Sequence, residues 1–213
     1  MKRVSSAPTA GTRRVGRPPA SEAWRVDDRI LKAATTLFLA RGFDGTSLED
    51  VALAAKAGKA SVYSRFPGKE ALFVAVVKRS IDRTMSFDLA LADEASVEQR
   101  LVAATTELLD RMLTQEVVSI MRVVIAETTR FPALADLIEE LGRRRAIALL
   151  AGIIGDDPKQ PTERADLLLS LVLFPLQFRA LMGADIGSLR ALIPAHVTSS
   201  VRLFCAGQGA LRG

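Results

Sequence analysis

Apolar residues recur at helical spacing along almost the whole chain after residue 26, and this periodicity constrains the fold more than any other feature. In the segment 27–41, one helix face is formed by Ile30, Ala33, Ala34, Leu37 and Phe38. Runs that alternate between apolar and polar residues are absent from the sequence, and aromatic residues make up only 5% of it. The pattern predicts an all-α fold of about nine helices.

The other helices expected from this periodicity are separated by turn residues. They lie at about 46–55, 59–64, 69–89, 96–113, 116–129, 132–154, 162–182 and 188–205. Gly42 is expected to end the first helix in a left-handed conformation. Thr46 and Glu49 match a capping box, and Ser96 and Gln99 match a second one. Three short helices are therefore followed by a larger helical region.

The composition excludes several classes of protein. Hydrophobic residues make up 49% of the 213 residues, which is enough to bury a core. The single cysteine, Cys205, excludes a disulfide scaffold, and with only one histidine, His196, a zinc site is not expected. The apolar runs 146–155 and 167–178 are too short to span a bilayer, and the basic N-terminus does not read as a signal peptide. We expect a cytoplasmic protein with no metal, no cofactor and no membrane partner.

Positive charge is concentrated at the N-terminus. The formal net charge is +5, and residues 1–25 carry six basic side chains against the single acidic Glu22. We expect residues 1–26 to form a flexible basic arm, which either contacts a polyanion such as nucleic acid or only increases solubility.

Within the arm, residues 13–19 read Arg-Arg-Val-Gly-Arg-Pro-Pro. This Gly-Arg-Pro core flanked by arginines resembles an AT-hook. Glycine lets the backbone approach the floor of the minor groove, proline keeps the chain extended, and arginine enters the narrow groove. The resemblance implies that Arg14 and Arg17 contact double-stranded DNA.

Residues 27–73 have the spacing of a helix-turn-helix unit, with the turn 56–58 between the second and third expected helices. In such a unit the third helix enters the major groove of DNA. Val62 and Phe66 are expected to face the core. The residues left outward or at the edges are Lys59, Ala60, Ser61, Tyr63, Ser64 and Arg65. Small and polar side chains suit close approach to base edges and phosphates.

Short motifs follow one another at fixed spacing through residues 29–73. They read Arg-Ile-Leu-Lys-Ala-Ala, Leu-Phe-Leu-Ala-Arg-Gly-Phe, Thr-Ser, Val-Ala, Val-Tyr-Ser-Arg-Phe-Pro and Lys-Glu-Ala-Leu-Phe. In this order they resemble the N-terminal domain of the tetracycline-repressor (TetR) family of bacterial transcription regulators. The resemblance implies an all-helical homodimer. Residues 27–73 would bind DNA, and residues 74–213 would form a larger helical domain that binds an effector and dimerises.

The resemblance also implies DNA contacts residue by residue. Thr46 and Ser47 would contact phosphate, Lys59, Ala60 and Ser61 would face bases, and Tyr63, Ser64 and Lys69 would hold the DNA backbone. Three of these residues have a simpler alternative: Thr46 caps its helix, Tyr63 only packs against the fold, and Lys69 is a solvated lysine at a helix start.

The turn departs from the family pattern, which has glycine followed by an aliphatic residue and serine. Lys56, Ala57 and Gly58 stand there instead. Lys56 is expected to take a left-handed backbone conformation, and Gly58 is expected to serve as the N-cap of the third helix.

Residues 121–127 and 130–135 are similar to the C-terminal domain of the AefR-like branch of the same family. Met121, Ile125 and Phe131 are expected in the interior, and Pro175 is expected to kink its helix and open a cavity. The candidate effector-binding residues are Met121, Arg122, Ile125, Phe174, Gln177 and Phe178. The alternative is that this stripe of Met and Phe is only core.

The last two expected helices are apolar on more than one face, so each must be buried on more than one side. This predicts a two-fold dimer interface. Its expected residues are Leu167, Leu168, Leu171, Val172, Leu189, Leu192, Ile193, Val197, Val201 and Phe204. His196 is expected to be a satisfied interface residue, Cys205 a buried small hydrophobe, and the arginines 143–145 a solvated face.

The function predicted from these features is that of a DNA-binding transcriptional regulator that acts as a repressor. It would bind a palindromic operator as a homodimer and be released by a small, apolar effector. The alternative is an architectural protein that binds DNA without regard to sequence. An enzyme is not expected, because the sequence shows no nucleophile–base pair, metal cluster or glycine-rich phosphate loop.

Overall fold

The computed structural model describes residues 20–89, 94–155 and 161–210, and every regular element in these ranges is helical. The helices are α1 (Ala20–Arg41), α2 (Leu48–Ala54), α3 (Lys59–Tyr63), α4 (Lys69–Met85), α5 (Val97–Met112), α6 (Gln115–Glu127), α7 (Ala133–Ile138), η1 (Glu139–Arg143), α8 (Arg144–Ile154), α9 (Pro161–Leu181) and α10 (Ile186–Ala210). α7, the π-helical segment η1 and α8 follow without a break and form one rod. Counted this way, the described residues form nine helices, which confirms the predicted all-α fold.

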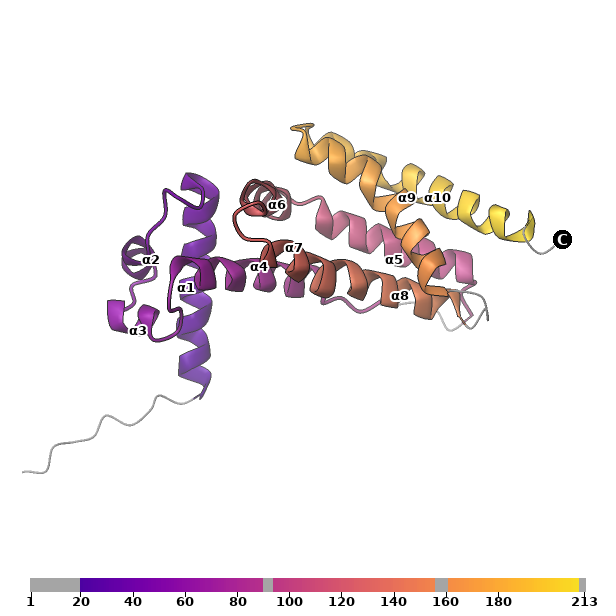
Figure 1. Ribbon diagram of the computed structural model, residues 1–213. Helices are drawn as coiled ribbons and strands as arrows, with labels where there is room; N and C mark the ends of the chain where they lie inside the picture. The colour runs from indigo at the N-terminus through magenta and orange to yellow at the C-terminus, as the bar shows by residue number, and fades with distance from the viewer. Residues whose placement is uncertain (1–19, 90–93, 156–160, 211–213) are drawn as a thin grey trace, which may run out of the picture.

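Figure 1 shows two unequal parts joined by α4. α1, α2 and α3 form the small part at one end of the molecule. The remaining helices form the larger part, in which α9 packs against α8 and α10, and α10 also packs against α5. None of the helices in the described ranges has the length and apolarity needed to cross a membrane.

Most helix boundaries agree with the periodicity, but α1 begins at Ala20 rather than at residue 27. The sequence changes there from Pro18-Pro19 to Ala20-Ser21-Glu22-Ala23, and these later residues are compatible with a first helical turn. The pair Asp27-Asp28 lies inside α1 instead of at its start. Asp28 pairs with Arg79 of α4, and Asp27 pairs with Arg65 in the turn after α3.

Local backbone features follow the sequence closely in the small part. Gly42 has a φ of 70° and ends α1, and Lys56 has a φ of 50° in the turn, so both left-handed conformations were predicted correctly. Gly58 is the N-cap of α3, as expected. The capping box of Ser96 and Gln99 is present at the start of α5.

The expected capping role of Thr46 is wrong. Ser47 caps α2, and its hydroxyl accepts a hydrogen bond from the Asp50 backbone N–H at 3.1 Å. Thr46 is only 2% exposed, and its hydroxyl donates to the Gly42 carbonyl at 2.9 Å. Two adjacent hydroxyl residues both suit an N-cap, and the buried position of Thr46 leaves the role to Ser47.

Two apolar clusters hold the described residues together. The first fills the small part and is centred on Phe38, Phe43 and Phe73, with Phe38 and Phe73 edge to face at 4.9 Å between ring centroids. Ile120 and Val124 of α6 and Leu134 of α7 belong to the same cluster. The small part therefore shares its core with two helices of the larger part.

The second cluster lies between α5, α8, α9 and α10. It contains most of the residues expected at a dimer interface, namely Leu168, Val172, Leu189, Ile193, Val197 and Val201. Leu167, Leu171 and Leu192 are instead exposed. α9 and α10 are therefore apolar on two sides, with one side buried within the chain and the other facing outward.

Candidate nucleic-acid interface and ligand cavity

α2 and α3 form a helix-turn-helix unit in which α3 keeps one residue in the core and turns the others outward. Val62 is fully buried, whereas Lys59, Ala60, Tyr63 and Ser64 are exposed. Gly58 is the N-cap of α3, and no side chain there makes a capping hydrogen bond. The outward face of α3 is therefore accessible to a groove of DNA.

Tyr63 is held by a carboxylate of the neighbouring helix. Its phenol donates a hydrogen bond to Glu49 Oε1 of α2 at 2.6 Å. This hydrogen bond raises the pKa of Tyr63 above 10.0 and lowers the pKa of Glu49 below 4.5. The ring stays 46% exposed, so the pair fixes its direction without burying it.

Ser61, expected to face bases, is engaged by an arginine. Arg65 Nη1 donates to Ser61 Oγ at 2.7 Å and to the Ser61 carbonyl at 3.0 Å. Arg65 Nε pairs with Asp27 of α1. Ser64 donates to the Ser61 carbonyl at 3.1 Å. These contacts fix the end of α3 against α1.

Lys69 lies at the start of α4, as expected, but it is not a free lysine. Its Nζ donates to the Asp44 carbonyl at 3.3 Å and lies 4.5 Å from the centroid of the Phe43 ring. Ser47 occupies the cap of α2, and its hydroxyl also donates to an Asp50 carboxylate oxygen at 2.8 Å. The buried hydroxyl of Thr46 does not reach the surface, so the phosphate contact expected of it is not supported. Arg14 and Arg17 lie outside the described residues.

The two parts of the molecule are connected by a joint that the sequence did not predict, formed by the contacts of Arg130 with Asp44 and of Phe131 with Phe43. Arg130, after α6, pairs with the Asp44 carboxylate at 2.8 Å, and this hydrogen bond raises the pKa of Arg130. The rings of Phe43 and Phe131 lie 5.0 Å apart between centroids. The joint therefore links the segment after α6 to the turn between α1 and α2. This turn leads directly into the helix-turn-helix unit.

The larger part contains a cavity of about 270 Å³ bordered by α4, α5, α6, α7, η1, α8 and α9. Of the predicted effector-binding residues, Met121, Phe174 and Gln177 line it. Its lining is mostly apolar, and the polar side chains that reach it include Ser80 and Thr84 of α4. These α4 residues and the η1 residue Gly142 were not predicted, because the cavity is assembled from helices far apart in the sequence.

Three predicted effector-binding residues lie elsewhere. Ile125 is 51% exposed rather than interior. Arg122 donates to the carbonyls of Ala180 at 2.6 Å and Leu181 at 3.1 Å, so it satisfies the end of α9 instead of reaching the cavity. Phe178 stacks on Phe174 at 5.4 Å on the outer side of α9.

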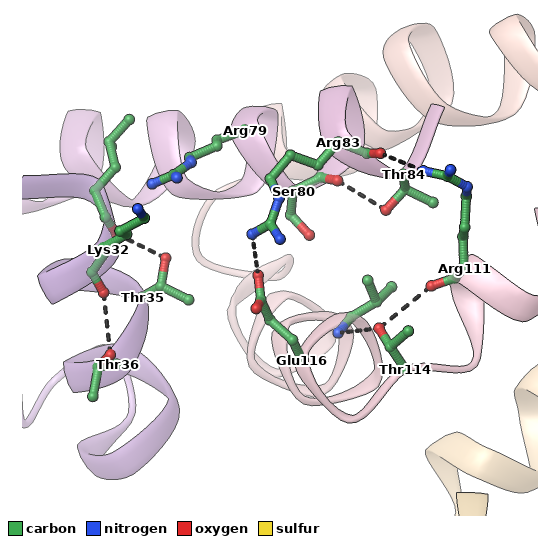
Figure 2. A network of polar contacts seen from close by, with 12 residues as sticks. Lys32, Thr35, Thr36, Arg79, Ser80, Arg83, Thr84, Arg111, Thr114 and Glu116 are labelled. Atoms are coloured by element: carbon green, nitrogen blue, oxygen red, sulfur yellow. Dashed lines mark hydrogen bonds and ion pairs between the residues drawn. The ribbon is translucent and has the colours of Figure 1, made fainter. Parts of the chain in front are cut away.

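A polar network next to the cavity connects α4 to α5 and α6 (Figure 2). Arg83 of α4 pairs with Glu116 of α6 at 3.1 Å, and Arg111 of α5 donates to the Arg83 carbonyl at 3.1 Å. Thr84 donates to the Ser80 carbonyl one turn earlier at 2.9 Å. The helix that leads into the small part is thus tied to two walls of the cavity.

An exposed third helix in a helix-turn-helix unit, joined to a helical region with an apolar cavity, defines the class of helix-turn-helix regulators. Residues 30–76 match the bacterial regulatory proteins of the tetR family. Residues 99–209, more than half of the chain, match the C-terminal domain of AefR-like transcriptional repressors. The chain therefore belongs to the TetR family of transcriptional regulators, with a C-terminal domain of the AefR-like type.

Two curated relatives support this assignment. The chain is 30% identical over 184 residues to an uncharacterized HTH-type transcriptional regulator of Mycobacterium tuberculosis (strain CDC 1551 / Oshkosh), a match that covers 82% of this chain and 84% of that protein. It is 40% identical over 55 residues to IcaR, the HTH-type negative transcriptional regulator of the biofilm operon icaADBC in Staphylococcus aureus (strain Newman). The IcaR match spans 26% of this chain and 30% of IcaR.

Solved structures extend the likeness to most of the chain. A TetR-family regulator from Mesorhizobium loti is 28% identical with a TM-score of 0.72, covering 86% of this chain and 96% of that one. The flavonoid-responsive regulator FrrA is 27% identical with a TM-score of 0.70, covering 86% of this chain and 97% of that one.

Proposed function

We propose that this protein is a homodimeric repressor that binds a palindromic operator and is released by a small, apolar effector. The observation that carries the proposal is the outward face of α3, where exposed residues surround the single buried anchor Val62. Lys59 and Ala60 at the start of α3 would read base edges. Tyr63 and Ser64 would contact the DNA backbone, and the Tyr63 phenol would release Glu49 so that its single O–H can donate to a phosphate oxygen.

The outer face of α9 and α10 supports the homodimer. Its large apolar side chains are exposed in the single chain, namely Leu167, Leu171, Phe174 and Phe178 of α9 and Leu192 and Leu203 of α10, and Met182 directly after α9 is exposed as well. Those on α9 recur at intervals of three or four residues and share one helix face. A two-fold arrangement of α9 and α10 would cover this face and leave two copies of α3 to meet one duplex.

The cavity supports an apolar effector. Its volume of about 270 Å³ lies just below the roughly 300–1,000 Å³ of typical ligand pockets, so the ligand would be small. Ser80, Thr84 and Gln177 offer a few hydrogen-bonding groups among apolar walls. The similar regulator FrrA is flavonoid-responsive, which favours a compact aromatic molecule with hydroxyl groups.

Selection of bound duplexes from a random pool tests the DNA-binding part of this proposal. We expect an enriched palindrome whose half-sites lie about 34–36 Å apart, with light scattering showing a dimer. Binding without any enriched sequence would favour the architectural alternative instead. A monomer that binds single half-sites would contradict the role proposed for α9 and α10.

A flavonoid panel tests the effector. We expect a cavity-binding member of the panel to lower the affinity for the selected duplex. Gln177→Leu keeps the approximate size of the side chain and removes its hydrogen-bonding groups, so it should weaken this response. Gln115→Leu, the same substitution at an exposed residue of α6 outside the cavity lining, is the matched control and should leave ligand binding nearly unchanged. Equal responses in both variants would contradict the proposed site.

A further inference from the structure

The N-terminal end of α1 extends past the point where α1 meets α3. Asp27 pairs with Arg65, the second residue after α3. Trp24 lies three residues earlier on α1, about 4.5 Å further along the helix axis. In Figure 1 α3 lies beside the half of α1 that leads to this N-terminal end, and α1 runs on beyond it. A duplex held by α3 would therefore pass close to the first described turns of α1.

The side chains on these turns are unusual for a solvent-facing helix end. Trp24 is 68% exposed, although an indole is among the largest apolar side chains. Arg25 and Arg29 are also exposed, and they lie four residues apart, so they share a face of α1. An exposed indole beside a pair of arginines combines a flat apolar surface with positive charge.

The chain outside the described residues adds to this charge. Residues 1–19 contain Lys2, Arg3, Arg13, Arg14 and Arg17 and no acidic residue, and they join the molecule directly at the start of α1. Positive charge is thus continuous in sequence from the N-terminus to Arg25, with Glu22 as the only acid. Asp27 and Asp28, which follow, are paired with Arg65 and Arg79. A polyanion fits this end of α1 better than an apolar protein partner does.

We propose that Trp24 and Arg25 form a second DNA contact, which grips the backbone that flanks the half-site read by α3. This inference rests on the proposed function. The Arg25 guanidinium would bind phosphate, and the Trp24 indole would pack on a sugar or donate its N–H to a phosphate. The contact adds affinity and carries no base preference of its own.

Trp24 is the only tryptophan in the chain, so its emission reports on this site alone. The full chain is titrated with the selected duplex, and anisotropy of a dye on the DNA measures binding independently. We expect bound DNA to shift the Trp24 emission and to protect it from acrylamide. Saturated anisotropy with unchanged acrylamide quenching would overturn the inference and leave the proposed function intact. No anisotropy change with any duplex would overturn both.

A charge variant tests the same contact by affinity. Arg25→Ala should weaken binding about three- to tenfold and reduce the log–log salt slope by about 2, because each subunit of the dimer loses one phosphate contact. Arg25→Lys should restore most of the slope. On a duplex trimmed to the palindrome, the flanking backbone is absent, so Arg25→Ala and the wild type should bind with equal affinity. Arg100→Ala, at an exposed arginine of α5, is the matched control. Identical behaviour of Arg25→Ala and Arg100→Ala on the long duplex would overturn the inference.

Discussion

The α2–α3 surface and the cavity differ in how their side chains are held. On the α2–α3 surface, polar groups are tied to one another by short contacts, as in the pairs Tyr63–Glu49 and Ser61–Arg65, above a closely packed aromatic core. The cavity has mostly apolar walls and an open volume of about 270 Å³. The α2–α3 surface is therefore preorganised before it binds DNA, whereas the cavity walls have room to repack around a ligand.

This difference separates two tasks within one chain. A surface that reads DNA needs side chains at fixed positions, because a base edge offers a fixed pattern of donors and acceptors. A ligand site that changes the shape of a protein must bind its two states unequally, and loosely packed walls allow two arrangements. If the two regions differ in this way, substitutions in them should have unequal effects on stability, coupling and DNA binding.

The largest expected effect compares the same substitution in both regions. Leu72→Ala lies on α4 in the closed core of the small part and should lower the free energy of unfolding by about 4–5 kcal/mol. Leu169→Ala borders the existing cavity, loses fewer contacts, and should cost only about 2 kcal/mol. Urea denaturation followed by circular dichroism measures both values. Equal costs would show that the cavity walls are as closely packed as the core of the small part.

The joint between the regions gives the next effect. Phe131→Ala removes the ring that contacts Phe43 and should reduce the effect of a bound effector on DNA affinity by about 0.5–2 kcal/mol. Phe131→Leu keeps apolar contact and should behave almost like the wild type. DNA titrations with and without the effector give the coupling. An undiminished coupling in Phe131→Ala would show that another route connects the regions.

A smaller effect separates the two roles on α3. Tyr63→Phe removes the hydroxyl and should weaken binding to every duplex by about fivefold, close to 1 kcal/mol. Lys59→Ala should instead change which duplexes are preferred. Competition binding with a matched set of operator variants measures both. The reverse pattern would exchange the roles assigned to these two residues.

The smallest effect concerns the pair that directs Tyr63. It is the only tyrosine in the chain, so tyrosinate absorbance titrates this residue alone. Glu49 raises the pKa of Tyr63, so the stabilisation is present below pH 10.0 and is lost as the pH rises through the higher folded-state value. Glu49→Gln should move the midpoint down toward 10.0. An unchanged midpoint would mean that the pair does not persist in solution.

The sequence predicted features that depend on near neighbours. The left-handed Gly42 and Lys56 and the Ser96 cap involve residues within a few positions of each other, and all three are present. The choice between Thr46 and Ser47 as a cap failed, because only burial distinguishes two adjacent hydroxyl residues.

Contacts between distant segments were not predictable in this way. Arg130 meets Asp44 across 86 positions, and Arg122 meets the carbonyls at the end of α9. From the sequence alone, an arginine on an apolar helix is equally compatible with hydrogen bonding to a ligand and with capping the end of another helix. Only the packing of α6 against α9 decides between them.

The π-helical segment Glu139–Arg143 has a consequence for how this rod tolerates insertion and deletion. A π turn is an α-helical turn that has taken in one extra residue. Removing one residue there would restore an ordinary turn and keep α7 and α8 in phase. The same deletion within α8 would rotate the residues that follow by about 100° and displace Ala146, Ile147 and Leu150 from the core. The π-helical segment is thus the place where this cavity wall can lose one residue and still keep its other side chains in position.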